Sequence, residues 1–87
     1  MPRVSFFYGI AIYIYWNEGD HPIPHFHVIQ AEQRASVSVE GVVLAGKLER
    51  RALDLVARWA RLHRDELFVN WELARDNQQI PPIAPLP

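Results

Sequence analysis

Residues 25–40, HFHVIQAEQRASVSVE, carry the pattern that decides the fold. Apolar and polar side chains alternate along the second half of this stretch, where every second residue is alanine or valine. A period of two is typical of a β-strand with one buried face. The connection at residues 31–33 is short enough to join two antiparallel strands directly. The sequence therefore predicts a hairpin whose strands cover residues 25–30 and 34–40.

The segment before this hairpin, residues 6–16, is rich in aromatic and β-branched side chains, which favour strands. Its alternation predicts one long strand, and residues 17–20 predict the turn that follows. One side of the strand carries Phe6, Tyr8, Ile10, Ile12, Ile14 and Trp16, and the other carries Phe7, Gly9, Ala11, Tyr13 and Tyr15. After the hairpin, the apolar residues 42–44 form either part of a turn or a fourth, edge strand.

Over residues 48–76 the apolar period becomes helical, with apolar side chains at i, i+3 and i+4. Phe68 would lie on the polar face of one continuous helix. Either the helix breaks near residues 63–65, with Asp65 as the new N-cap, or Phe68 marks a contact with a partner. Of these, we predict two helices rather than one. His63 falls in the apolar stripe and is predicted to be a hydrogen-bonded core residue. The fold class is predicted to be α+β, with a three- or four-stranded antiparallel sheet followed by one or two C-terminal helices packed on one face.

The chain has 87 residues, which is enough for one domain only. We predict an α+β domain over residues 1–79 and an extended, proline-rich tail over residues 80–87, which either packs on the domain or hangs free. The N-terminus lacks a basic segment followed by a clean apolar one, so no signal peptide is predicted. The longest apolar run is too short to span a membrane. These features favour a cytoplasmic protein without membrane contact.

Composition excludes several classes of site. The chain has no cysteine, which excludes disulfides and cysteine-bound zinc, and it has no glycine-rich phosphate loop, so no cofactor is predicted. The formal net charge is −1, so the whole chain is not a basic nucleic-acid binder. Arg50, Arg58 and Arg61 nevertheless share the helix face opposite the apolar stripe. Asp54 is four residues from two of them, so we interpret this face first as solvated surface and second as a phosphate contact.

Three of the four histidines lie within residues 20–27, DHPIPHFH. His25 and His27 are two residues apart, so on a strand they project from the same face. Neutral imidazoles at this spacing could hold a transition metal, with His21 or a carboxylate such as Asp20 as the third ligand. Protonatable imidazoles could instead form an acid–base pair that moves the proton of a ribose 2′-hydroxyl. In the third interpretation they are simply polar residues on an exposed strand.

Alternation places further side chains beside these histidines. If the isoleucines and valines of the strands face the helices, the opposite face carries Tyr13, Tyr15, His25, His27, Arg34, Ser36 and Ser38. Open sheets of this composition bind single-stranded RNA, because bases stack on the rings while arginine and hydroxyl groups hold phosphate and sugar. We predict His25 and His27 as the catalytic pair of a metal-independent ribonuclease, and Tyr13, Tyr15, Arg34 and Ser36 as substrate-binding residues. The same face would also suit a partner or dimer interface.

Short motifs follow one another along the chain in a specific combination: FYGI at 7–10, His21, PHFHV at 24–28, GKL at 46–48, Trp59, His63, EL at 66–67, NWE at 70–72, PI at 82–83 and PL at 85–86. In this combination, nearly the whole chain resembles an uncharacterised bacterial family, domain of unknown function 4160. Ile23 departs from the pattern, because the family more often has the first of two prolines there. The departure loosens the turn before His25 without touching the histidines.

The resemblance implies a small standalone bacterial protein, often encoded beside another small protein in the manner of a toxin–antitoxin pair. Such an arrangement implies a cytoplasmic protein with a tight protein partner. The family motif includes His21, His25, His27, His63 and Trp71, but no accepted catalytic role comes with them.

We therefore expect a component of a bacterial toxin–antitoxin-like module, the toxin rather than the antitoxin, that acts on RNA through His25 and His27. Its expected partners are a small cognate protein encoded nearby, RNA, and a second copy in a homodimer. Two alternatives stay open. One is a non-catalytic protein-binding or dimerisation module, and the other is a small metal-binding protein that uses His21, His25 and His27.

Overall fold

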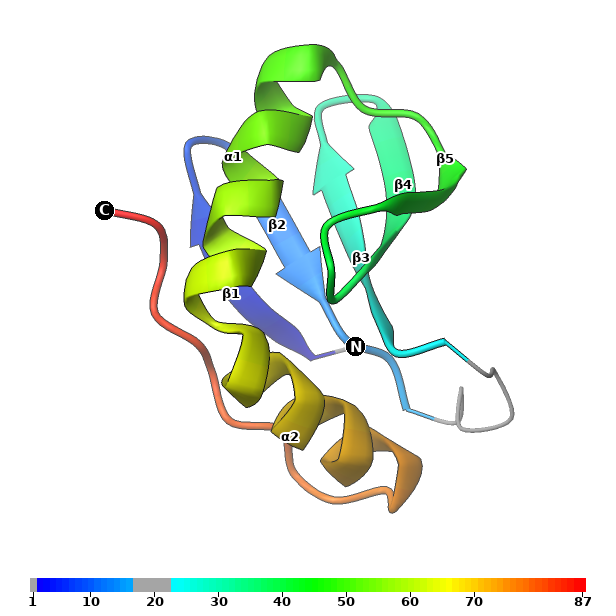
Figure 1. Cartoon of the computed structure of the whole chain (residues 1–87). Helices are drawn as coiled ribbons and strands as arrows, with labels where there is room; N and C mark the ends of the chain where they lie inside the picture. Colours follow the sequence, from blue (N-terminus) through cyan, green and yellow to red (C-terminus); the bar gives the residue numbers. More distant parts are fainter. Residues whose placement is uncertain (1, 17–22) are drawn as a thin grey trace.

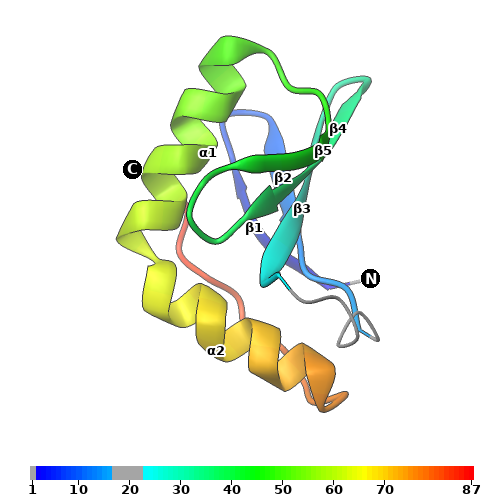
Figure 2. The same cartoon turned by 45° about the vertical axis from the view of Figure 1, so that its right-hand side comes forward.

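The computed structural model describes residues 2–16 and 23–87, which form five strands and two helices (Figure 1). The elements are β1 (Arg3–Phe7), β2 (Ile10–Tyr13), β3 (His25–Gln30), β4 (Gln33–Ser38), β5 (Val43–Gly46), α1 (Arg50–Leu62) and α2 (Arg64–Arg75). The strands form one antiparallel sheet in the order β1-β2-β3-β4-β5. Both helices lie on one side of this sheet (Figure 2). The predicted α+β class is confirmed, whereas the prediction of three or four strands is wrong because there are five.

The additional strand arises at Tyr8 and Gly9, where the predicted long strand of residues 6–16 folds back on itself. Phe7 pairs with Ile10 across these two residues, and φ is +50° at Tyr8 and +76° at Gly9. Positive φ at both central residues is the geometry of a type I′ turn, which matches the twist of a two-stranded hairpin. The predicted single strand is therefore a hairpin, β1–β2.

The side of the strands that was expected to face the helices is buried at Ile10, Ile12, Ile14, Phe26, Val28, Ala35, Val37 and Val39. Phe6, Tyr8 and Trp16, which alternation assigned to the same side, are exposed. In β1 the predicted faces are reversed, because residues paired across a two-residue turn lie on the same face. Phe7 is therefore buried, whereas Phe6 is 51% exposed.

The predicted hairpin of β3 and β4 is confirmed, and β3 has its predicted bounds. Gln30 pairs with Gln33, so the turn has two residues and β4 begins one residue earlier than expected. The alternative fourth strand is present as β5, which pairs with β4 after a shift of register. Gly46 ends β5 with φ of +83°, and a Cβ at this position would collide with the carbonyl oxygen of Arg34. The predicted turn at residues 17–20 lies outside the described part of the chain.

Trp59 of α1 is the centre of the core. Its ring centroid lies 5.5 Å from that of Phe7 and 5.6 Å from that of Phe26, so one indole joins β1 and β3 to the helix. Val56 and Ala60 are buried beside it on the same face of α1. Burying a side chain of the size of valine stabilises a fold by about 1.5–3 kcal/mol.

The helical segment breaks at His63, within the predicted region. α1 ends at Leu62 and α2 begins at Arg64, so His63 occupies the N-cap position of α2, and no side chain caps this end. The prediction of Asp65 as the cap is therefore wrong. The break brings Phe68 into half-buried contact with the core, which a continuous helix would not have allowed. Neither helix in the described ranges has the length and apolar content that crossing a bilayer requires.

The proline-rich segment 80–87 packs on the rest of the molecule, which selects one of the two alternatives left by the sequence. Ile80, Ile83 and Leu86 are buried, at the three-residue spacing of a polyproline II helix. The Ile83 amide donates to the Val4 carbonyl at 2.8 Å, and the Trp59 indole donates to the Ala84 carbonyl at 2.9 Å. The segment thus adds apolar area to the same core.

Candidate functional site

A row of side chains crosses three strands on the outer face of the sheet, away from the helices. Strand register places Tyr13 of β2 opposite His27 of β3, and His27 opposite Ser36 of β4. Directly paired residues on one face have neighbouring side chains. Tyr15 follows two residues after Tyr13, and its ring stacks beside the Tyr13 ring with centroids 6.1 Å apart. The sequence predicted this row by alternation.

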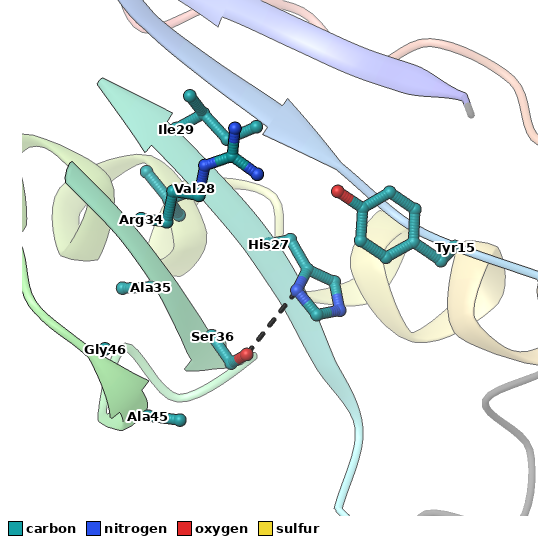
Figure 3. A pocket seen from close by; sticks show the side chains of 9 residues that line it. All are labelled: Tyr15, His27, Val28, Ile29, Arg34, Ala35, Ser36, Ala45 and Gly46. Carbon is teal, nitrogen blue, oxygen red and sulfur yellow. Dashed lines mark hydrogen bonds between the residues drawn. The ribbon is translucent and has the colours of Figure 1, made fainter. Parts of the chain in front are cut away.

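The row borders an open pocket of about 340 Å³ (Figure 3). It is lined by Tyr15, His27, Val28, Ile29, Arg34, Ala35, Ser36, Ala45 and Gly46. Four of the six predicted site residues, Tyr15, His27, Arg34 and Ser36, therefore share one concavity. Sequence reasoning missed the wall made by Ala45 and Gly46, because their contribution depends on how β5 pairs with β4.

The imidazole of His27 is held between two neighbours. The Tyr15 ring lies over it, with centroids 4.3 Å apart, and a long hydrogen bond of 3.4 Å joins its Nδ1 to the Ser36 hydroxyl oxygen (Figure 3). His27 is half-buried, so one part of the ring borders the pocket and another packs on the protein. This arrangement fixes the orientation of the ring before a ligand arrives.

Arg34 supplies the positive charge of the pocket. Its side chain is exposed, and it makes no ion pair with any carboxylate in residues 2–16 and 23–87. Its backbone carbonyl accepts a hydrogen bond from the Lys47 amide at 2.9 Å, which holds β4 close to the end of β5. Gly46 permits this approach because it has no Cβ. An exposed guanidinium can bind an anionic group such as a phosphate.

His25 lies close to His27 on the same strand face, but the two histidines differ in exposure. The two ring centroids are 5.1 Å apart, yet His25 is only 3% exposed and does not line the pocket. Its ring packs on the indole of Trp71 in α2, with centroids 4.9 Å apart. Its Nδ1 donates to the Ile23 carbonyl at 2.8 Å, because a carbonyl oxygen can only accept. His25 therefore packs beside His27 without lining the pocket.

Trp71 reaches His25 because α2 runs beyond the end of the sheet where β3 begins (Figure 1). Sequence periodicity placed Trp71 in the apolar stripe of the helix, which predicted burial but not this neighbour. The contact joins segments almost fifty residues apart in the chain, and no local pattern encodes it.

The metal-binding alternative needs His21, which lies outside the described residues. Within residues 2–16 and 23–87, no three side chains of the metal-ligating types gather in one place. The metal-binding interpretation stays a prediction.

The remaining candidates lie on the helices. His63 is hydrogen-bonded, as expected, through a 2.6 Å contact between its Nδ1 and a Glu66 carboxylate oxygen, but it is half-buried rather than buried. Arg50 pairs with Asp54 at 3.8 Å, while Arg58 is exposed. The helix α1, which carries these arginines, lies on the other side of the sheet from the outer face that holds the pocket (Figure 2).

These features define a small α+β protein with a five-stranded antiparallel sheet and an aromatic, cationic pocket on its open face. The model of the family Domain of unknown function (DUF4160) matches residues 9–72, which include the whole pocket. The chain belongs to this family, as the motifs indicated. No curated protein and no solved structure matches the chain.

Proposed function

We propose that this protein binds single-stranded RNA in the outer-face pocket and acts on it as the toxin of a two-protein, toxin–antitoxin-like module. The observation that carries the proposal is the convergence of Tyr15, His27, Arg34 and Ser36 on one concavity. The family resemblance adds the two-protein context. The proposal uses no cofactor.

Each of these groups matches one part of a nucleotide. A base stacks on the exposed part of the Tyr15–Tyr13 pair, and such stacking contributes about 1–3 kcal/mol per base. The Arg34 guanidinium holds the phosphate by a charge-assisted hydrogen bond. The Ser36 hydroxyl contacts the sugar, where the 2′-hydroxyl distinguishes RNA from DNA.

His27 is the proposed acid–base residue, and His25 is a positioning residue. In metal-independent cleavage, a base removes the proton of the 2′-hydroxyl, and the 2′-oxygen attacks the adjacent phosphorus. The bond from phosphorus to the 5′-oxygen breaks, and that oxygen takes up a proton. The products are a 2′,3′-cyclic phosphate and a 5′-hydroxyl end. An imidazole suits both transfers near neutral pH.

The test uses the purified chain with fluorescein-labelled single-stranded RNA and with DNA of the same sequence. We expect RNA to bind more tightly than DNA, and Arg34→Gln to weaken binding about tenfold. Arg75→Gln, which removes an exposed arginine from α2, is the matched control and leaves binding unchanged. Equal binding by wild type and Arg34→Gln would contradict the pocket assignment.

Expression in a bacterial host tests the toxin assignment separately. We expect growth arrest with the chain alone, relief by the protein encoded beside it, and loss of arrest with His27→Gln. RNA fragments ending in 2′,3′-cyclic phosphate would support cleavage. RNA binding without growth arrest and without RNA fragments would show that the chain binds RNA but is neither a toxin nor a ribonuclease.

A non-catalytic protein-binding module is the second candidate, and the edge strand β5 favours it. Val42 and Leu44 are exposed beside backbone groups that pair with β4 on one side only. Unpaired strand edges with apolar side chains recruit further strands. Size-exclusion chromatography with light scattering decides this point, because a strict monomer that never co-purifies with its genomic neighbour would count against the module.

A further inference from the structure

Two exposed side chains of β1 continue the outer face of the sheet beyond the pocket. Arg3 is paired with Tyr13, so its side chain lies beside that ring on the same face. Phe6 is paired with Ala11, and Ala11 is paired with Ile29, which lines the pocket. Phe6 is 51% exposed, although phenylalanine is usually buried. The outer face therefore carries a cation and an aromatic ring that have no role in the RNA site described above.

A β-bulge in β1 brings these two side chains together. Residues three apart on a regular strand point to opposite faces. The register shifts between Arg3 and Ser5, so Val4 and Ser5 are both buried, whereas Arg3 and Phe6 are both exposed. The guanidinium carbon of Arg3 lies over the Phe6 ring, 5.1 Å from its centroid. The cation and the ring therefore form one unit on the outer face, held by a cation–π contact.

The bulge also places a polar group in an unfavourable position. Ser5 is only 8% exposed, and its hydroxyl oxygen has no hydrogen-bond partner within residues 2–16 and 23–87. An unpaired buried hydroxyl destabilises a fold, and such groups are uncommon in proteins. Bulges are frequent beside functional sites, where they redirect side chains. The position of Ser5 therefore points to a function of the two side chains that the bulge redirects.

The Arg3 guanidinium is able to bind an anion. Arg3 is exposed, and no carboxylate in the described part of the chain forms an ion pair with it. A guanidinium beside an aromatic ring offers a phosphate donor and a stacking surface at adjacent positions. Two strand spacings, about 10 Å, separate β1 from His27 on β3. Arg3 and Phe6 therefore reach a different part of a ligand from the part that His27 contacts.

We propose that Arg3 and Phe6 form a second nucleotide subsite on the same RNA strand. This inference rests on the proposed function, because it extends the RNA from the pocket to β1. A base stacks on the exposed part of the Phe6 ring, and the Arg3 guanidinium binds a neighbouring phosphate. Tyr13 connects the two subsites, because it is paired with Arg3 on one side and with His27 on the other. The ligand is therefore a strand of several nucleotides that crosses the sheet from β4 to β1.

The test titrates a dinucleotide and a hexanucleotide of uridine into the uniformly labelled full chain, followed by amide NMR. The dinucleotide should shift the amide of Ser36 at the pocket, and the hexanucleotide should shift the amides of both Ser36 and Phe6. The hexanucleotide should also bind at least about tenfold more tightly, because a further base stacks. In the double variant Arg3→Gln with Phe6→Leu, dinucleotide binding should stay unchanged, and hexanucleotide binding should weaken about tenfold. This comparison with wild type removes any gain that arises only from the larger number of binding registers on a longer strand.

Two control variants separate the subsite from general effects. Arg3→Lys with Phe6→Tyr keeps a cation and a ring, and it should retain most of the hexanucleotide affinity unless the double variant acts by disturbing the strand. Arg75→Gln removes an exposed arginine from α2 and should leave both affinities unchanged.

The outcomes distinguish this subsite from the pocket. If the hexanucleotide shifts Ser36 but not Phe6, the subsite is overturned and the pocket assignment stands. Equal hexanucleotide affinity in wild type and in Arg3→Gln with Phe6→Leu has the same meaning. If neither oligonucleotide binds, the proposed function and the subsite are overturned together.

Discussion

At the scale of single residues, the two histidines of β3 differ in role, because one is a buried structural residue and the other belongs to the proposed site. His25 packs on Trp71 and bonds to a carbonyl, whereas His27 borders the pocket. We expect His25→Ala to lower the free energy of unfolding by about 2–4 kcal/mol, because it empties a buried site. His27→Ala should cost about 1 kcal/mol or less and remove RNA cleavage, because His27 is the proposed acid–base residue. Urea denaturation and an RNA cleavage assay distinguish the two variants, and equal destabilisation would contradict the assignment.

Gly46 and Gly9 form a second residue-scale comparison, because both have positive φ. A Cβ at Gly9 meets no atom within 4 Å, whereas a Cβ at Gly46 meets the backbone of Arg34 and Ala35. We expect Gly9→Ala to cost about 1–2 kcal/mol from backbone strain alone. Gly46→Ala should lower the free energy of unfolding by more than this and disturb the pocket wall. Urea denaturation of both variants measures the difference. Equal losses of unfolding free energy would show that β5 shifts readily to accommodate the added Cβ.

At the scale of elements, the C-terminal segment behaves as part of the core. We expect Ile83→Ala to destabilise the fold by about 2–4 kcal/mol, because it removes a buried side chain. Pro85→Ala is the control on the exposed side of the same segment, and its effect should stay within about 0.5 kcal/mol. Denaturation followed by tryptophan fluorescence reports both, since Trp59 donates to Ala84. Similar stability of the two variants would mean that the segment is only loosely attached.

The elements also show how far a sequence predicts structure. The hairpin of β3 and β4 followed from clean alternation, and the helix break followed from one misplaced apolar residue, Phe68. The turn at Tyr8 and Gly9 did not follow from the sequence. Phe6 and Phe7 are both aromatic, so the pattern of side chains does not show that the buried face changes there. The burial of His25 could not be predicted either, since it depends on a helix that arrives from the distant end of the chain.

At the scale of the whole molecule, the sheet separates the pocket from the basic side chains of α1. One arginine serves the proposed pocket, so few phosphates are contacted. We expect the logarithm of the RNA association constant to fall with the logarithm of salt concentration with a slope of about −0.7 to −1.4, the value for one or two phosphates. Arg58→Gln with Arg61→Gln should leave the slope unchanged. A slope of about −3, lost in this double variant, would place RNA on the helix instead.

The hydrogen bond between Val4 and Ile83 has a consequence for how the protein is made. It joins the first strand to the last residues, which also contribute Leu86 to the core. A ribosome adds about 5–20 residues per second and exposes the chain from its N-terminus. The N-terminal hairpin therefore emerges long before the segment that covers its edge. The core therefore cannot be completed until Leu86 has left the exit tunnel.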